Sequence, residues 1–229
     1  MTKSRKFQPD RTYHVTHRCH NREYLLKTDI DCKEYMRLLW SASQRWKVSL
    51  FSYIITSNHV HLLLTAPKLE ELSGFMGHVS GGMSHYYNRR KKRLGSFWEG
   101  RYRTTLIQDG SHLSRCMFYI AMNMVRAGVV DHPSEWGWSS HNELLGQRKR
   151  YKLLDIDRFI RKLDCGSHEQ FVQWYNKTLQ AKCSQKEKLK REPWWSESSC
   201  IGDSEFVEEF AGANKEMYIQ NYNDEVYYL

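Results

Sequence analysis

Apolar and polar positions along the first half of the chain follow the periods of strands and helices in turn. Short runs rich in β-branched and aromatic residues predict strands at about 12–18, 48–56, 59–65 and 102–108. Apolar positions three and four residues apart predict helices at 29–46, from about 69 to 93, and at 111–128. This order of elements is typical of an α+β domain built on one sheet.

Two histidines one residue apart stand in the strand predicted at 59–65. His59 and His61 point to the same face of such a strand, with Cα atoms roughly 6.5–7 Å apart, while Val60 faces the core. Both imidazoles can therefore converge on one divalent ion. Taken alone, however, the pair is explained more simply as two strand histidines without a ligand.

The helix predicted at 111–128 carries a second group of polar side chains. Ser111 suits its N-cap and Gly128 its C-terminal end. Tyr119, Asn123 and Arg126 share one face beside the apolar stripe. A hydroxyl, an amide and a guanidinium together suit a phosphodiester better than a core, although Tyr119 alone would be interpreted as a packed amphipathic aromatic.

The overall charge favours a nucleic-acid partner. Lys and Arg number 35 against 26 Asp and Glu, which gives a net charge of +9 and a pI near 9.2. The charge is distributed unevenly along the chain, since residues 203–229 hold seven acidic residues and one lysine. The remaining body is therefore more basic than the average suggests.

Five consecutive cations end the helix that begins near residue 69: Arg89, Arg90, Lys91, Lys92 and Arg93. A solvated helix end accounts for one or two of these charges. Five in a row repel one another, so we predict that this basic run, residues 89–93, binds phosphates. Four glycines within the same helix, at 74, 77, 81 and 82, are expected to mark a bend or a close approach of DNA.

Two further arginines, Arg101 and Arg103, follow among aromatic residues that include Trp98. Aromatic side chains among cations can stack on unpaired bases. The indole of Trp98 suits such stacking and a place in the core equally well.

Four motifs in this order and spacing resemble the REP-associated tyrosine transposases, relatives of the single-tyrosine HUH transposases of bacterial insertion sequences. The motifs are Tyr13–Thr16, Ser57–Leu63, Phe97–Arg103 and Tyr119–Gly128. The resemblance covers about residues 8–145. It implies a central antiparallel sheet with packed helices, a ferredoxin- or RRM-like α+β fold, and cleavage of single-stranded DNA beside a REP-like hairpin.

By this resemblance Tyr119 is the nucleophile, and His59, His61 and Asn123 hold a divalent metal. Attack by Tyr119 would leave a 5′-phosphotyrosine bond and a free 3′-hydroxyl, which permits rejoining without ATP. Two imidazoles and an amide oxygen form a partly open donor set. We expect Mg²⁺ or Mn²⁺ there rather than a closed structural zinc site.

The chain departs from the family pattern at two places. The family usually has proline where this chain has Met124, which we expect only to relax the helix. The family also usually has glycine and asparagine where this chain has Cys19–Asn21. The second departure leaves open the shape of the loop after the first strand and its contacts with DNA.

Beyond residue 145 the family motifs stop. We therefore divide the chain into a catalytic domain at 1–145 and an extension at 146–229 that is mainly helical, first basic and then acidic. Helices are predicted at 155–163 and 168–179. We hypothesise that the acidic end, residues 203–229, folds back on the DNA groove and competes with phosphates.

The six cysteines form no CxxC pair and follow no signal peptide, so we expect reduced thiols in a cytoplasmic protein. His17, Cys19 and His20 lie close in sequence, but strand alternation separates His20 from the other two and disfavours a zinc site. No apolar stretch approaches the ~20 residues of a membrane span.

Two classes of function follow from the sequence. The favoured one is a metal-dependent DNA endonuclease and strand transferase acting on hairpin-flanked single strands. The alternative is a protein on the same fold that binds hairpin nucleic acid and has lost cleavage or uses it for regulation. The resemblance favours a monomer over a dimer.

Overall fold

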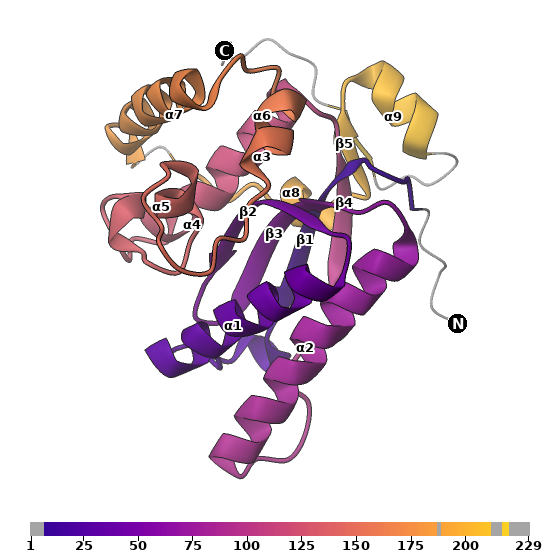
Figure 1. Ribbon diagram of the computed structural model, residues 1–229, viewed down its shortest axis with the longest axis vertical. Coiled ribbons are helices and arrows are strands. Elements are labelled where there is room, and N and C mark those ends of the chain that lie inside the picture. Colours follow the sequence, from indigo (N-terminus) through magenta and orange to yellow (C-terminus); the bar gives the residue numbers. More distant parts are fainter. Residues whose placement is uncertain (1–6, 187–188, 212–216, 220–229) are drawn as a thin grey trace.

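A six-stranded sheet runs through the molecule in the order β2-β3-β1-β4-β5-β6. The computed structural model describes residues 7–186, 189–211 and 217–219 (Figure 1). Its strands are β1 (Thr12–Arg18), β2 (Ser49–Ile55), β3 (His59–Thr65), β4 (Arg103–Ile107), β5 (Cys200–Gly202) and β6 (Met217–Ile219). Each strand predicted in the first half of the chain is present, within about two residues of its expected ends.

The first four strands form an antiparallel unit, with β1 between β3 and β4. This unit confirms the predicted α+β fold with a central antiparallel sheet. The extension adds two short strands to it, because β5 pairs parallel with β4 and β6 pairs parallel with β5. The extension is thus joined to the sheet through backbone hydrogen bonds.

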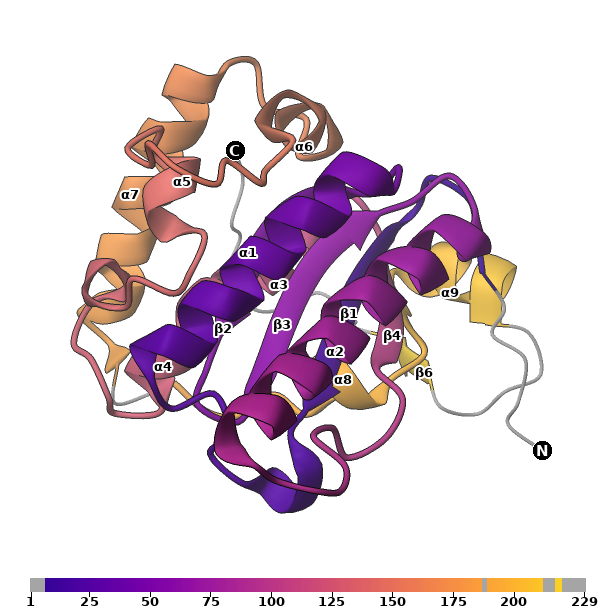
Figure 2. The same ribbon diagram turned by 60° about the horizontal axis from the view of Figure 1, so that its bottom comes forward.

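Two long helices, α1 (Asp29–Arg45) and α2 (Leu69–Lys91), lie side by side over one face of the sheet (Figure 2). Thr28 caps α1 by accepting a hydrogen bond from the Asp31 N–H. Alternate residues of β3, namely Val60, Leu62 and Leu64, are fully buried beneath these helices, as the strand pattern requires.

Two glycines of α2 permit its close packing against α1. A Cβ atom at Gly74 would lie 2.4 Å from the Trp46 ring, and one at Gly82 would lie 2.6 Å from Leu38. At these two positions the expectation of a bend or of DNA approach was wrong, because the space is filled by α1 and by the residue after it. Gly77 and Gly81 face open space instead.

Helices of the second half cover the opposite face of the sheet (Figures 1 and 2). They are α3 (Ser111–Ala121), α4 (Asn123–Arg126), α5 (His141–Leu144), α6 (Ile156–Lys162) and α7 (His168–Cys183). Phe51 of β2 stacks on Phe159 of α6 at 5.3 Å between ring centroids. The sheet is therefore buried on both faces. The shorter elements are α8 (Trp194–Glu197), α9 (Ser204–Ala211) and two 3₁₀ turns, His20–Arg22 and Pro133–Glu135.

The helix predicted at 111–128 divides at Met122, whose ψ of 5° interrupts the α-helical backbone between α3 and α4. Hydrogen bonds of the helical type still bridge the break, from Met122 N–H to Phe118 and from Arg126 N–H to Met122. The predicted N-cap at Ser111 was wrong, since Gly110, with a φ of 75°, precedes the first turn.

None of the helices in the described part of the chain is both long and apolar enough to cross a membrane. All six cysteines are free thiols, and Cys19, Cys32, Cys116 and Cys200 are buried. Most of the acidic end lies outside the described residues. Its described helix, α9, places Phe206 and Phe210 under the guanidinium of Arg11.

Candidate active site

His59 is held at the start of β3 by the turn that precedes it. Its Nδ1 lies 2.7 Å from Asn58 Oδ1 and 2.9 Å from Thr56 Oγ1. The Asn58 amide donates its own N–H to the Arg22 carbonyl, so its oxygen faces the histidine. His59 Nδ1 therefore carries the proton, and the lone pair of a neutral ring is on Nε2.

His61 lies two residues further along the same strand and is 4% exposed. Its ring is 4.9 Å from that of His59, centroid to centroid, at an interplanar angle of 83°. One ring nitrogen, Nδ1, is 2.8 Å from His14 Nε2, and the other, Nε2, is 3.2 Å from the Asn123 side-chain amide. The predicted face-sharing of the two histidines is therefore observed.

Tyr119 comes to the same place from α3. Its ring centroid is 5.9 Å from that of His61 and 6.0 Å from that of Trp195. The Arg126 guanidinium lies over the tyrosine ring at 4.3 Å from the centroid, and it also donates to the Tyr119 carbonyl. The break at Met122 thus leaves Tyr119, Asn123 and Arg126 on one side of the helix pair.

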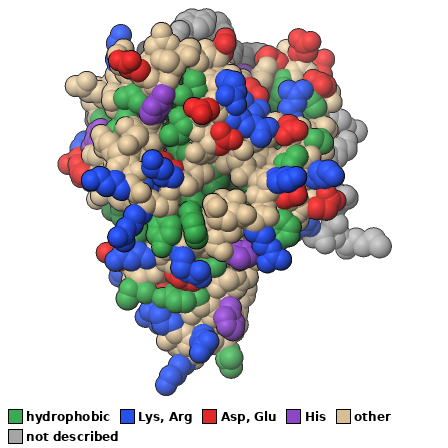
Figure 3. All heavy atoms as spheres, in the orientation of Figure 1, with side chains coloured by type: hydrophobic (Ala, Val, Ile, Leu, Met, Phe, Trp, Pro, Cys, Tyr) green, Lys and Arg blue, Asp and Glu red, His purple; other side chains and the backbone are tan. Residues whose placement is uncertain are grey.

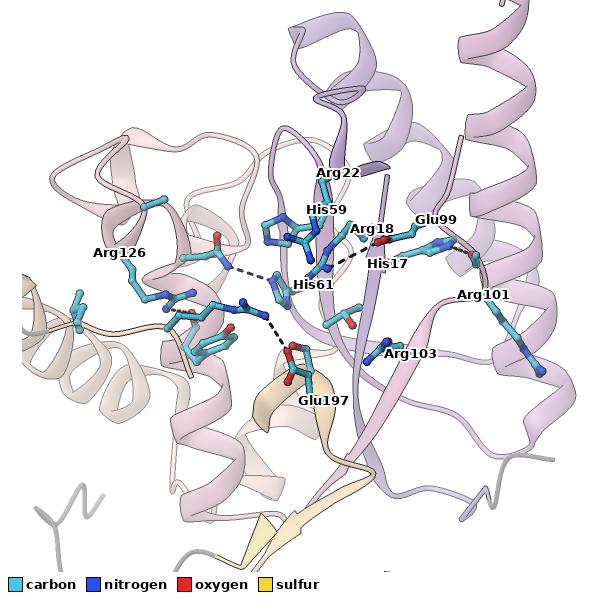
Figure 4. A pocket seen from close by; sticks show the side chains of 18 residues that line it. His17, Arg18, Arg22, His59, His61, Glu99, Arg101, Arg103, Arg126 and Glu197 are labelled. Carbon is cyan, nitrogen blue, oxygen red and sulfur yellow. Dashed lines mark hydrogen bonds and ion pairs between the residues drawn. The ribbon is translucent and has the colours of Figure 1, made fainter. Parts of the chain in front are cut away.

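These side chains line one pocket of about 1120 Å³ (Figure 4). Tyr119, Asn123, His59 and His61 all contribute to its wall. Six arginines and two glutamates surround them: Arg18, Arg22, Arg101, Arg103, Arg126, Arg191, Glu99 and Glu197. The cationic excess makes the pocket suited to an anionic ligand.

Both glutamates of the pocket are paired with arginines. Arg18 lies 3.9 Å from Glu99, and Arg191 lies 3.0 Å from Glu197 (Figure 4). Within the described residues Arg126 forms no ion pair with a carboxylate, and its contact is with Tyr119. Among the arginines beside the tyrosine, Arg126 is therefore the one best placed to meet a phosphate there.

Burial sets the protonation of the site. It lowers the pKa of His59 to about 4, with a further contribution from Arg18, and lowers that of His61 well below 6.5. Both imidazoles are consequently neutral at neutral pH. Burial also raises the pKa of the Tyr119 phenol above 10, and the neighbouring Arg126 opposes that rise.

The donor groups fit a divalent ion. Neutral His59 and His61 offer Nε2 lone pairs, and the Asn123 amide, whose oxygen and nitrogen are interchangeable by a flip, sits beside His61 Nε2. In the described part of the chain, no three His, Cys, Asp or Glu side chains are arranged to hold a metal. An ion would therefore rely on two imidazoles, one amide oxygen and ligands from outside the chain.

The basic run lies away from this pocket, at the end of α2 that projects from the body (Figures 1 and 3). Arg89, Lys91 and Lys92 are exposed there, and Arg89, Lys92 and Arg93 line a second, more open hollow. Arg90 instead forms an ion pair with the buried carboxylate of Asp31.

Aromatic contacts resolve the alternatives for Trp98. The indole is 7% exposed, stacks on His17 at 4.0 Å between centroids, and donates to the Ser80 carbonyl. Trp98 is therefore a core residue.

His17 contacts the Trp98 ring and lies 2.8 Å from the Gly100 carbonyl oxygen through its Nε2. Burial raises the pKa of the Cys19 thiol to about 12.

Several residues near the site were not identified from the sequence. Arg18, Arg22 and Arg191 line the pocket, and His14 and Trp195 contact its wall. Strand alternation places His14 and Arg18 on the same face of β1, and His14 also lies within the first family motif, but neither signal pointed to a role in the site. No local pattern marks Arg191 or Trp195, since both reach the site through the pairing of β5 with β4.

Comparisons with known proteins identify the family and the fold. Residues 8–123 match the family model described as "Transposase IS200 like". A solved structure described as a REP-associated tyrosine transposase bound to a REP hairpin is similar in fold, with a TM-score of 0.55 and 18% identity. That similarity covers 69% of this chain and 90% of the other.

A second solved structure, a putative transposase from Deinococcus radiodurans R1, is 18% identical with a TM-score of 0.38. The match covers 52% of this chain and 92% of that one. No curated protein matches the chain. The family match confirms the resemblance to single-tyrosine transposases that the four motifs indicated.

Proposed function

Since the chain belongs to the family of IS200-like transposases, we propose that it binds hairpin-flanked single-stranded DNA, cleaves it through Tyr119 and rejoins strands. The solved relative with the same fold is described as bound to a REP hairpin, and we carry that class of ligand over to this chain. The proposed enzyme is a metal-dependent single-strand endonuclease and strand transferase.

One observation carries the proposal. A phenol, two neutral imidazoles and an amide, which come from α3, β3 and α4, line the same arginine-rich pocket. Six arginines and two glutamates line this pocket, so its net charge is positive beside the phenol. A phosphodiester would supply the negative charge that balances this excess.

The proposed reaction is the one that the family resemblance implies. The Tyr119 oxygen attacks the phosphorus, the bond from phosphorus to the 3′-oxygen breaks, and the released 3′-oxygen takes up a proton to become a hydroxyl. The phenol releases its proton to solvent, which balances the proton taken up by the 3′-oxygen, and Arg126 over the ring stabilises the negative charge that develops on the phenol oxygen. Rejoining reverses these steps with another 3′-hydroxyl as the nucleophile.

His59, His61 and Asn123 would hold the ion, which we propose to be Mg²⁺ or Mn²⁺. When bound, it would polarise the non-bridging oxygens of the scissile phosphate. Neutral imidazoles suit this task, since a protonated ring has no lone pair to offer. As the family resemblance favours, we propose that the protein acts as a monomer.

The exposed cations at the end of α2 take a different part. Arg89, Lys91 and Lys92 project outside the pocket, and we assign them to the backbone of the hairpin stem. Contacts of this kind contribute affinity that depends on salt and carry no sequence information. The pocket then receives the unpaired strand beside the stem.

The test is covalent capture. The protein and its Tyr119→Phe variant are incubated with a labelled oligonucleotide that carries a hairpin and a single-stranded tail, with Mn²⁺ or Mg²⁺, and separated under denaturing conditions. A labelled adduct is expected with the natural protein. No adduct is expected with Tyr119→Phe, or when EDTA is present during the incubation. Tyr151→Phe, on an exposed loop outside the pocket, is the matched control and is expected to retain the adduct.

The alternative function gives a different result. A protein that only binds hairpins would shift the oligonucleotide in a native gel and would produce neither adduct nor nick over a range of hairpin sequences. An adduct that persists in Tyr119→Phe would contradict the assignment of the nucleophile.

A further inference from the structure

A chain of hydrogen bonds runs through the protein behind the site. His14 Nδ1 is 2.6 Å from the Trp195 carbonyl oxygen, and His14 Nε2 is 2.8 Å from His61 Nδ1. His61 Nε2 then faces the Asn123 amide at 3.2 Å. His14 is fully buried, and its ring is nearly parallel to that of His61, with 4.9 Å between the centroids and an interplanar angle of 12°.

The Trp195 carbonyl, at one end of this series of hydrogen bonds, determines which ring nitrogen of each histidine carries a hydrogen. A carbonyl oxygen can only accept, so His14 Nδ1 must carry the hydrogen that is donated to Trp195. The His14 ring is fully buried and forms no ion pair with a carboxylate of the described residues, so it is neutral, because an unpaired buried charge is costly. A neutral ring protonated on Nδ1 has its lone pair on Nε2.

The hydrogen bond with His14 in turn determines the tautomer of His61. Because His14 Nε2 can only accept, His61 Nδ1 must donate to it. His61 is buried as well, and in the described residues it forms no ion pair with a carboxylate, so the ring is neutral, has no hydrogen on Nε2 and presents a lone pair to the pocket. This deduction does not depend on which way the Asn123 amide is turned.

We propose that His14 and the Trp195 carbonyl are positioning groups that hold His61 in its Nδ1–H tautomer, with the Nε2 lone pair aimed into the pocket. The meaning of this tautomer for metal binding rests on the proposed function, whereas the tautomer itself does not. His61 would otherwise be free to adopt either tautomer, and one of the two cannot bind an ion through Nε2. Outer hydrogen bonds of this kind commonly orient histidine ligands.

The extension, residues 146–229, holds the Trp195 carbonyl in place. Trp195 is 1% exposed and follows Pro193 in the short helix α8. Thr105 of β4 donates to the Ser198 carbonyl at 2.7 Å, and β5 begins two residues later. The position of the Trp195 carbonyl is therefore set by the pairing of the extension with the sheet. Residues 193–202 are part of the site rather than an appendage to it.

The test reads the tautomer directly in metal-free protein. Ring ¹⁵N chemical shifts distinguish a protonated from an unprotonated nitrogen, and we expect His61 to appear as the Nδ1–H form. His14→Phe removes the acceptor, and His61 is then expected to populate both tautomers. His14→Gln, whose amide can accept from His61 and donate to Trp195, is expected to restore the Nδ1–H form.

Calorimetric titration with Mn²⁺ alone gives a second readout. His14→Phe is expected to bind Mn²⁺ about tenfold to a hundredfold more weakly than the natural protein, with recovery in His14→Gln. His141→Phe is the matched control, since it removes a buried histidine that is bonded to Tyr175 outside the pocket. Its Mn²⁺ affinity is expected to be unchanged.

An Nε2–H form of His61 in the natural protein would overturn the proposal, even if His14→Phe failed to fold. So would a His61 tautomer and a Mn²⁺ affinity that are both unaffected in His14→Phe. Neither result involves DNA cleavage. A protein that forms no adduct but shows the predicted tautomer change would retain the positioning device and lose the proposed function.

Discussion

The pocket beside Tyr119 and the basic run at the end of α2 both gather positive charge, but they are built in opposite ways. The run is consecutive in sequence, and its exposed members spread outward around a helix end (Figure 3). The pocket instead takes single arginines from segments as distant as Arg18 and Arg191, and these line the same cavity as Tyr119 and the two histidines. We propose that the dense run serves general contact with DNA, whereas the proposed chemistry depends on charges that only the fold brings together.

Arg90 makes the contrast sharper. It belongs to the run in sequence but to the core in structure, since it pairs with Asp31, which is 1% exposed. Its guanidinium also lies 5.6 Å from the ring centroids of Tyr86 and Tyr87. Neighbouring cations therefore have different roles, and substitutions can separate them.

The largest effect is expected for Arg126→Gln. Loss of the guanidinium over Tyr119 removes the group that stabilises developing charge there, so adduct formation should slow by about 10²–10³-fold. Single-turnover rates at saturating DNA measure this effect, and Arg89→Gln removes an equal charge outside the pocket as the control. Equal losses of rate in the two variants would contradict the distinction between the two regions.

Arg90→Gln is expected to act on stability instead. It leaves the Asp31 carboxylate buried without its partner, which should lower the free energy of unfolding by about 3 kcal/mol. Urea denaturation measures this change. Arg89→Gln, at an exposed position next to it, should change stability by no more than about 0.5 kcal/mol. An unchanged free energy of unfolding in Arg90→Gln would contradict this structural role and would favour assigning Arg90 to the DNA-binding surface.

These expectations show which parts of the molecule the sequence could reveal. Strand and helix periods are local, and so β1 to β4, α1 and α2 were predicted closely. The pairing of His59 with His61 and of Tyr119 with Asn123 and Arg126 is also local, since each set lies on one element or on neighbouring turns. Their convergence in one pocket was indicated only by the resemblance to a known family.

Contacts between distant segments could not be read in this way. The bond from His14 to Trp195 joins residues 181 positions apart, and it exists because β5 adds to the edge of β4. The burial of Arg90 depends on the packing of α2 against α1, which places Asp31 beside it. Burial of Trp98 against His17 depends likewise on where β1 lies in the sheet.

A smaller effect is expected of pH on the free energy of unfolding, and it should come from the buried histidines beside the pocket. Burial holds the pKa of His14 near 4 in the folded protein, below the value of about 6.5 in the unfolded chain. Stability from this group is complete above pH 6.5 and declines as the pH falls toward 4. Between pH 7 and pH 6 the loss should be about 0.7 kcal/mol for each such histidine. Urea denaturation of metal-free protein should show a shallower pH dependence in His14→Gln, and identical slopes would contradict this assignment.

The smallest effect is expected at the basic run. Replacing Lys91 and Lys92 together by glutamine should weaken DNA binding modestly and reduce the slope of log affinity against log salt by about 1.4–1.8. The rate of adduct formation once DNA is bound should not change. Fluorescence anisotropy over a salt series measures the slope. A slope equal to that of the natural protein would remove these lysines from the DNA surface.

The central claim, that Tyr119 becomes joined to DNA, is tested most directly by mapping the adduct. Trypsin should release residues 116–126 as a peptide in which Tyr119 is the only tyrosine. Mass spectrometry of the digested adduct should find a nucleotide joined to Tyr119 through its 5′-phosphate, and the other DNA product should end in a 3′-hydroxyl that a polymerase can extend. A nucleotide on a different residue, or cleaved DNA with no peptide attached, would contradict the account.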